Sequence, residues 1–190
     1  AVTIPNITVT YVKGAQEAPA KPDNANAKST SSTITLTGEE LNGKAFYITK
    51  SGGGQVLQTS DVCKDGTVTF DKLQLGESYD VYAYFPETDL KNRSSDTKVD
   101  TYKTNGVLTY AGATTLNASV GDTLPAQLSF TDAKTDGKKD YPVTWTLVNE
   151  QEGYQSGVFS AVGTYVFTAT ATVEGYDLVK TPEIKVTVSK

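Results

Sequence analysis

The sequence predicts an all-β protein made of two tandem antiparallel β-sandwiches, preceded by an N-terminal strand without partner strands and by a linker. No segment keeps helical periodicity, whereas alternation of apolar and polar residues with a period of two recurs along the chain. Short strands of this kind, separated by clusters of Gly, Asp, Asn and Pro, are typical of sandwiches. A chain of 190 residues also suits two small domains better than one.

The N-terminal segment resembles the C-terminal one. Residues 3–13 (TIPNITVTYVK) align without gaps with residues 180–190 (KTPEIKVTVSK), and both are alternating runs that follow a proline. We therefore expect residues 1–13 to be the final strand of a preceding, truncated domain, and the chain to be a slice of a longer modular array. The Ala- and Pro-rich residues 14–27 are interpreted as a linker.

The first sandwich is expected over residues 28–104. Three consecutive glycines, residues 52–54, lie between two of its expected strands and suit a hairpin that needs positive φ angles. A phosphate-binding loop would need a helix after the glycines, and the pattern predicts none. The alternation places strands near residues 24–29, 31–37, 44–50, 55–59, 67–71, 78–85 and 96–104.

Residues 73–83 (LQLGESYDVYA) carry the strongest local signal of the first sandwich. They resemble the segment that leads into strand F of fibronectin type III domains, where a tyrosine follows a leucine and a turn glycine. The resemblance extends over roughly residues 24–104, with residues 32–36 as strand B and residues 46–48 as strand C. It implies that Tyr79 is buried at the corner of the sandwich. The Trp found on strand B of many family members is absent here.

The second sandwich is expected over residues 105–190, with strands near residues 107–110, 113–118, 124–130, 141–149, 157–160, 163–173 and 182–189. Its motifs, in order, are GDTLP at 121–125, DG at 136–137, PVTW at 142–145 and GVFSAVGTY at 157–165. This order resembles a group 4 bacterial immunoglobulin-like domain. Trp145 alternates with apolar neighbours, so we expect it to point into the core.

Composition argues against most chemistries. The net charge of -5 disfavours nucleic acid and anionic membrane surfaces, which need clustered Lys and Arg. No stretch approaches the roughly 20 apolar residues that cross a bilayer. The chain has no His, and Cys63 is its single cysteine, so the usual general base, metal ligands and internal disulfides are missing. We therefore expect no enzymatic activity, no metal and no cofactor, and we interpret Cys63 as a small half-buried residue near a turn.

Two acidic clusters remain to be interpreted. Glu39 with Glu40, and Asp136 with Asp140, could in principle act as paired carboxylates, but both are expected in turns of small sandwiches. Residues 132–140 superficially suggest a calcium loop, yet the acids have the wrong spacing and alternate with lysines. We interpret both clusters as solvated, and residues 132–140 as a charged hairpin tip.

Four tyrosines are expected on the outer face of the sheet formed by strands C, F and G of the first sandwich, because side chains alternate between the two faces. Such a tyrosine face can stack on sugar rings or anchor a protein partner. Alternatively, the tyrosines cover the sheet as cross-strand pairs or pack on a neighbouring domain. The four residues are Tyr47, Tyr82, Tyr84 and Tyr102.

These features favour a non-catalytic structural or spacer module of a secreted or cell-surface bacterial protein. We expect a Gram-positive host, because secretion without disulfides is normal for Gram-positive surface proteins and the chain has a single cysteine. The alternative is an adhesin or carbohydrate-binding accessory module that uses the tyrosine face. The expected partners are neighbouring domains of the same parent protein, a glycan or host matrix protein at the tyrosine face, and a second copy through residues 1–13. Nucleic acid binding and membrane insertion are not expected.

Overall fold

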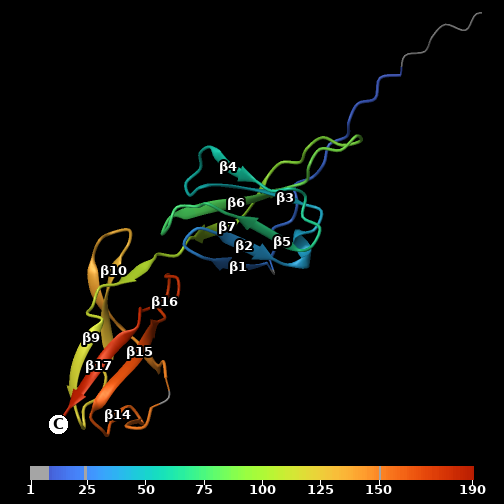
Figure 1. Ribbon diagram of the computed structural model, residues 1–190. Coiled ribbons are helices and arrows are strands. Elements are labelled where there is room, and N and C mark those ends of the chain that lie inside the picture. The colour runs from blue at the N-terminus through green and yellow to red at the C-terminus, as the bar shows by residue number, and fades with distance from the viewer. Residues whose placement is uncertain (1–8, 24, 150) are drawn as a thin grey trace, which may run out of the picture. The chain divides into compact units, whose positions relative to one another are not determined.

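The computed structural model describes residues 9–23, 25–149 and 151–190, and its contacts divide the chain into two compact units (Figure 1). The first unit is built mainly on residues 34–71 and 78–103, and the second on residues 104–190 together with two short earlier segments. Each unit is a β-sandwich with its own buried apolar core. The prediction of an all-β chain of two sandwiches is confirmed.

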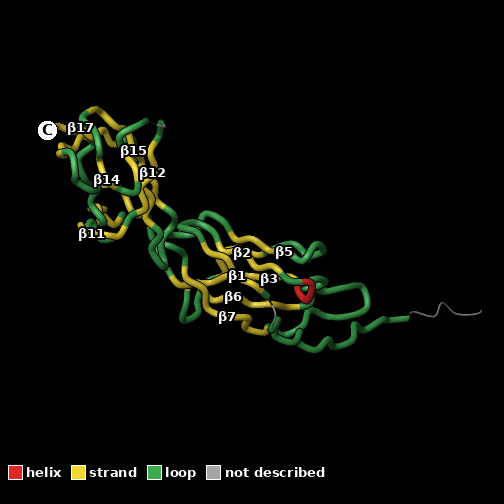
Figure 2. The backbone as a smooth tube through the Cα atoms, turned by 90° about the horizontal axis from the view of Figure 1, so that it is seen from below, coloured by secondary structure: helices red, strands yellow, loops and turns green. Residues whose placement is uncertain are grey.

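The first unit consists of a three-stranded sheet, in the order β1-β2-β5, and a four-stranded sheet, in the order β4-β3-β6-β7 (Figure 2). All seven strands expected from the alternation are present, with ends that differ from the expected ones by a few residues. They are β1 (Asn26–Ser29), β2 (Ile34–Thr37), β3 (Ala45–Lys50), β4 (Val56–Thr59), β5 (Thr67–Phe70), β6 (Ser78–Tyr84) and β7 (Thr97–Lys103).

Alternation explains how these strands fill the first core. Phe46 and Ile48 of β3 are fully buried, and so are Val81 and Ala83 of β6, while the residues between them face outward. Tyr79, at the start of β6, is 1% exposed, as the resemblance implied. The three glycines between β3 and β4 have φ angles of 93°, 91° and 134°, so they form the hairpin that their positive-φ freedom predicted.

The second unit has a three-stranded sheet, in the order β11-β10-β8, and a four-stranded run, in the order β12-β15-β17-β9, to which β16 adds beside β15. A short hairpin, β13–β14, accompanies them. The strands are β8 (Leu108–Tyr110), β9 (Thr115–Ser119), β10 (Gln127–Asp132), β11 (Lys138–Pro142), β12 (Thr144–Leu147), β13 (Tyr154–Gln155), β14 (Val158–Phe159), β15 (Gly163–Ala171), β16 (Val179–Lys180) and β17 (Ile184–Ser189).

Trp145 of β12 lies against the second core, as expected. Its ring meets Phe167 edge-on, with ring centres 6.0 Å apart, and packs against both clusters of buried residues in this unit. Its indole N–H donates to the Pro125 carbonyl at 2.7 Å, which provides the partner that a half-buried Trp needs.

The second unit differs from the expectation in the direction of one strand and in three strands that were not expected as such. The β9–β17 pair is parallel, although the sandwiches were expected to be antiparallel throughout. Parallel neighbours need a long connection, which the intervening residues of the unit supply. In addition, the strand expected near residues 141–149 covers only the last two residues of β11, because β11 is an edge strand that begins with Lys138 and Lys139 and is exposed on nearly all its residues. The two-residue strands β13 and β16 were not expected.

The segment expected as a linker lies against the first unit. Gly14 pairs with Lys91 in the connection between β6 and β7, and the Pro19 carbonyl accepts a hydrogen bond from the Thr97 hydroxyl at 2.6 Å. Pro19 and Pro22 are buried. Residues 14–22 are therefore packed on the first sandwich instead of forming an extended linker. Burial of their prolines removes apolar surface from water, which the Ala- and Pro-rich composition alone did not predict.

The expected N-terminal strand can be compared only in part. Residues 1–8 lie outside the described residues, and residues 9–13 form no strand. The Tyr11 hydroxyl donates to the Leu90 carbonyl at 3.0 Å, and Lys13 pairs with Glu87 at 2.5 Å. Val9 is 84% exposed. Residues 9–13 thus contact the β6–β7 connection through polar groups, while the apolar side chain of Val9 remains exposed to water.

Candidate functional site

The outer face of the four-stranded sheet brings together three of the four expected tyrosines. Tyr47 of β3 lies directly opposite Tyr82 of β6 in the strand register. Their rings stack with centres 4.9 Å apart and planes 10° from parallel. The Tyr84 ring lies 6.2 Å from that of Tyr47, tilted by 49°. We call these three residues, all half-buried, the tyrosine cluster.

Two residues of the β6–β7 connection complete the tyrosine cluster. The guanidinium carbon of Arg93 lies 3.8 Å from the centre of the Tyr84 ring, a cation–π arrangement. Asp96 accepts hydrogen bonds from Arg93 at 2.5 Å and from the Tyr47 hydroxyl at 2.9 Å. The contacts thus run in a closed circuit through Tyr47, Asp96, Arg93 and Tyr84, which fixes the connection onto the sheet.

The environment also sets the protonation state of Tyr47. Burial, followed by the hydrogen bond that its hydroxyl donates to the Asp96 carboxylate, raises the pKa of Tyr47 to about 12. Both causes disfavour the phenolate, because it would be poorly solvated and would face a second negative charge. Tyr47 therefore remains a neutral hydrogen-bond donor across the physiological pH range.

Tyr102 does not belong to the tyrosine cluster, which corrects the sequence-based expectation. It lies opposite Tyr79, and directly opposed residues of an antiparallel pair point to the same face. Tyr79 is buried in the core, so Tyr102 is on the core side of the sheet. The register shifts by one residue near Val81, and this bulge reverses the alternation along β7. Counting outward from Val99 therefore gave the wrong face.

A buried carboxylate lies beside the cluster on the same sheet face. Asp80, 3% exposed, accepts hydrogen bonds from the Thr101 hydroxyl at 2.6 Å and from the Gly52 N–H at 3.2 Å, and pairs with Lys98 at 2.9 Å. Lys98 in turn lies opposite Tyr82. The hydrogen bonds from Thr101, then Lys98, lower the pKa of Asp80 to about 2, against the opposing effect of burial.

The possible metal ligands, the cysteine and the acidic residues singled out in the sequence have structural surroundings. Within the described ranges, no group of three or more His, Cys, Asp or Glu residues is placed to hold a metal ion. Cys63, expected to be half-buried, is 5% exposed, and its thiol lies 3.6 Å from the Thr67 carbonyl. Asp132 organises the charged hairpin tip by accepting the N–H groups of Lys134 and Thr135. Asp140 lies on β11 rather than in a turn, and accepts a hydrogen bond from Ser129.

Sequence reasoning missed three residues around the tyrosine cluster: Asp80, Arg93 and Asp96. Asp80 alternates with Tyr82 and Tyr84 along β6, so its position on the outer face followed from the pattern. Its burial did not, because that depends on β7 and on the glycine hairpin. Arg93 and Asp96 are in an irregular connection, where no periodicity indicates direction. Only their opposite charges, three residues apart, hinted at a local pair.

Stacking uses part of the ring surface of the cluster. Tyr47 and Tyr82 present faces to each other, and Arg93 covers a face of Tyr84. What remains accessible is a mixture of ring edges, hydroxyls and a guanidinium side chain that is 42% exposed. Tyr and Arg together are the residue types enriched at protein interfaces and binding hot spots. The geometry can therefore offer a preorganised amphipathic surface.

Comparisons with known proteins return structural likenesses only. No protein-family model matches the chain, and no curated protein matches it. The FN1–FN3 domains of chicken CNTN1 are 7% identical, with a TM-score of 0.36, over 93% of this chain and 67% of that one. The fibronectin(III)-like modules of Clostridium thermocellum CbhA are 10% identical, with a TM-score of 0.33, over 94% of this chain and 90% of that one. At such low similarity, the fold assignment rests on the strand pairings described above.

Proposed function

We propose that the chain is a non-catalytic structural spacer within a bacterial protein of the cell surface or the secreted fraction. The observation that supports this role is the path of the chain through each unit, taken separately: it comes in at one end of the sandwich and leaves at the other. A module that separates its neighbours needs this path, whereas a module whose ends lie together adds little length.

In the first unit, the incoming chain lies beside the connection that follows β6, where Gly14 pairs with Lys91. The outgoing end of β7 lies at the start of β6, where Lys103 is opposite Ser78. The two points are separated by the length of β6, seven residues or about 20 Å.

The second unit has the same arrangement along its longest strand. Gly106 pairs with Tyr176, in the connection after the end of β15. Near its own end, β17 places Val188 opposite Gly163, the first residue of β15. The incoming and outgoing ends of this unit are therefore separated by the nine residues of β15, about 26 Å.

Single-molecule force spectroscopy tests the spacer role directly. With the chain held at both ends, we expect two separate unfolding events, each releasing about 250–300 Å at about 3.5 Å per residue. In the second unit, pulling the N-terminal end of β9 against the C-terminal end of β17 would shear their parallel hydrogen bonds together. A chain that extends without a resolvable barrier would argue against a spacer that bears load.

The position within a longer protein is part of the same proposal. Residues 1–13 would be the last strand of a preceding immunoglobulin-like domain, and residues 105–190 a bacterial immunoglobulin-like domain. In support, the matching C-terminal segment forms β17, which pairs with both β15 and β9.

Deleting residues 1–13 should leave both units folded and reduce self-association in analytical ultracentrifugation. Unfolding of the first unit would instead make the segment part of that domain. No helix in the described part of the chain could span a bilayer.

A second candidate function is ligand binding at the tyrosine cluster, favoured by the convergence of three tyrosines and Arg93 on one sheet face. The ligand would be a glycan or a matrix protein that meets ring edges and the guanidinium group. A glycan array and pull-downs with insoluble polysaccharides and matrix proteins provide the test.

The variant pair for this test follows from the corrected position of Tyr102. Combined Tyr82→Ala and Tyr84→Ala should abolish binding, whereas Tyr102→Ala, on the other face of the sheet, should leave binding intact. Binding that survives the double substitution would place the ligand elsewhere. No binding to any array member, polysaccharide or matrix protein would contradict a ligand-binding role of the tyrosine cluster and leave the spacer role standing.

A further inference from the structure

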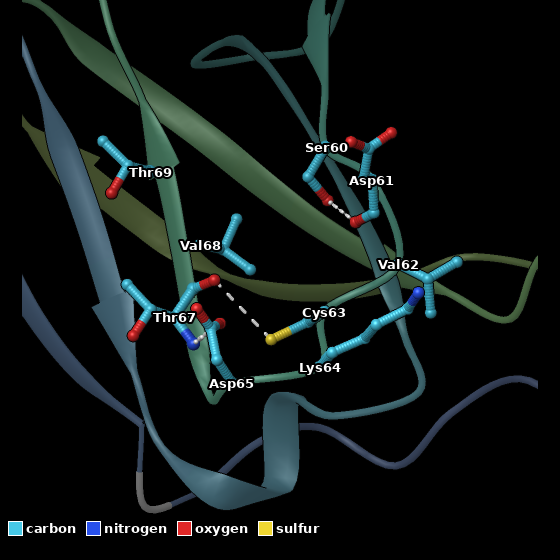
Figure 3. A pocket seen from close by; sticks show the side chains of 9 residues that line it. All are labelled: Ser60, Asp61, Val62, Cys63, Lys64, Asp65, Thr67, Val68 and Thr69. Atoms are coloured by element: carbon cyan, nitrogen blue, oxygen red, sulfur yellow. Dashed lines mark hydrogen bonds between the residues drawn. The ribbon is translucent and has the colours of Figure 1, made fainter.

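The first unit contains a cavity of about 690 Å³ between β5 and residues 60–65, the segment that follows β4 (Figure 3). Volumes of this size are typical of ligand sites. Val68 points toward the cavity from β5, and Cys63 approaches from the opposite wall. Both β5 and β4 are edge strands of their sheets, so the cavity lies where the sandwich is open at its side.

On the edge of β5 that faces away from β2, side chains contact the backbone groups of two residues, where a neighbouring strand would otherwise bind. At Thr67, the carbonyl faces the Cys63 thiol at 3.6 Å, and the N–H donates to the Asp65 carboxylate at 3.1 Å. At Asp71, the side-chain amide of Gln58 from β4 donates to the carbonyl and accepts from the N–H. An amide group is thus already docked on this edge.

Thr69 lies midway between these two residues. Backbone groups alternate in direction along a strand, so the N–H and C=O of Thr69 point the same way as those of Thr67 and Asp71, away from β2. In the described ranges no residue forms a hydrogen bond with either group; only the Thr69 hydroxyl is paired, with that of Thr35 at 3.0 Å. The edge therefore presents one open donor and one open acceptor to the cavity.

We propose that this cavity binds the main chain of an extended segment of a partner protein, which adds to β5 and exchanges two hydrogen bonds with Thr69. The Gln58 amide on Asp71 shows which chemistry complements this edge, and a peptide group has the same donor and acceptor. Val62, which is 38% exposed, offers a contact to an apolar side chain of the segment, whereas Val68 is 4% exposed and belongs to the core. This site is independent of both the spacer role and the tyrosine cluster.

The charge of the wall disfavours an acidic segment. Asp61 and Asp65 line the same cavity as Lys64, so the wall has an excess of negative charge and an anionic peptide would be repelled there. An alternating sequence of Thr and Val is therefore the simplest matching ligand, because it favours the extended conformation and has apolar side chains on one face.

The probe is a blocked heptapeptide, acetyl-TVTVTVT-amide, titrated into the isotope-labelled full chain and followed by NMR. We expect amide shifts at Val62, Thr69 and Asp71, together with slower hydrogen exchange of the Thr69 N–H. Shifts confined to the tyrosine cluster, or no shifts with millimolar peptide, would overturn the proposal.

Two substitutions at one position isolate the main-chain contact. Thr69→Pro removes the outward N–H, a change that edge strands tolerate, and should weaken peptide binding about tenfold. Thr69→Val loses the same hydroxyl but keeps the N–H, so it should bind like the wild type. Equal affinity of the two variants would refute the proposed pairing. If Thr69→Pro fails to fold, exchange protection of the wild-type Thr69 amide decides the matter.

Gln58→Ala provides a change in the opposite direction. It uncovers the backbone groups of Asp71, lengthens the open edge, and should tighten peptide binding several-fold. The same variants also identify the occupant. A concentration-dependent dimer that forms without peptide, and that Thr69→Pro abolishes, would show that a second copy rather than a different protein fills the cavity.

Discussion

At the scale of single residues, Asp80 shows how a side chain on an exposed sheet face becomes structural. It is one of the outward residues of β6, yet Gly52, Lys98 and Thr101 surround its carboxylate. Because Gly52 belongs to the glycine hairpin and Thr101 to β7, one carboxylate connects three elements of the sheet. Hydrogen bonds to an ionised group are stronger than those between neutral groups, so this contact is expected to contribute measurably to stability.

We expect Asp80→Asn to lower the free energy of unfolding of the first unit by about 1 kcal/mol at neutral pH. The folded-state pKa is about 2 and the ordinary value is 3.8, so the stabilisation by the carboxylate is complete above pH 3.8. It is lost as the pH falls toward 2. Urea unfolding as a function of pH provides the measurement. A difference between wild type and variant that persists at pH 2 would contradict this account.

At the scale of elements, irregular connections impose requirements that strand patterns do not reveal. The connection between β12 and β13 brings Gly153, at a φ angle of 100°, beside Tyr165. Tyr165 is buried, and its hydroxyl donates to the Ala161 carbonyl at 3.0 Å. A Cβ atom on Gly153 would lie 2.3 Å from that hydroxyl. The close approach of Tyr165 therefore requires a glycine here.

We expect Gly153→Ala to destabilise the second unit by about 2–4 kcal/mol, because a left-handed backbone and overpacking act together. Gly157→Ala is the matched control: its φ angle is 84° but no atom would lie within 4 Å of the new Cβ, so only about 1–2 kcal/mol should be lost. Adding Tyr165→Phe to Gly153→Ala should recover part of the loss. Thermal unfolding monitored by Trp145 fluorescence measures all three variants, and equal effects of the two glycine substitutions would disprove the steric explanation.

At the scale of the whole molecule, each unit has a separate core centred on its own aromatic residues. Tyr79 is buried in the first unit, while Trp145 packs on Phe167 in the second. Such cores make each unit a candidate for cooperative unfolding by itself.

We expect Tyr79→Ala to lower the free energy of unfolding of the first unit by about 3–5 kcal/mol. Trp145 is only half-buried, so Trp145→Ala should lower that of the second unit by about 3 kcal/mol. Each substitution should lower the transition of its own unit and leave the other near its original temperature. Differential scanning calorimetry distinguishes the two transitions. One shared transition, shifted by both substitutions, would show that the units do not unfold independently.

The sequence by itself determined the all-β architecture and the approximate position of most strands, because the two-residue period and the turn residues are local properties. It also determined the inward direction of Tyr79 and Trp145 and the glycine hairpin. Its failures follow from interactions between strands. The bulge in β7 reversed the direction of Tyr102, and a bulge depends on how two strands pair, which no pattern within one strand records.

Only the tertiary structure decided how distant segments meet. The parallel β9–β17 pair joins segments from opposite ends of the second unit. The alternation of side chains within a strand is the same whichever strand lies beside it, so the sequence pattern does not indicate the order of strands in a sheet. In the same way, Arg93 and Asp96 reach Tyr84 and Tyr47 from an irregular connection. Local chemistry fixes where the chain is extended and where it turns. The choice of neighbours is made by packing, which depends on the whole unit at once.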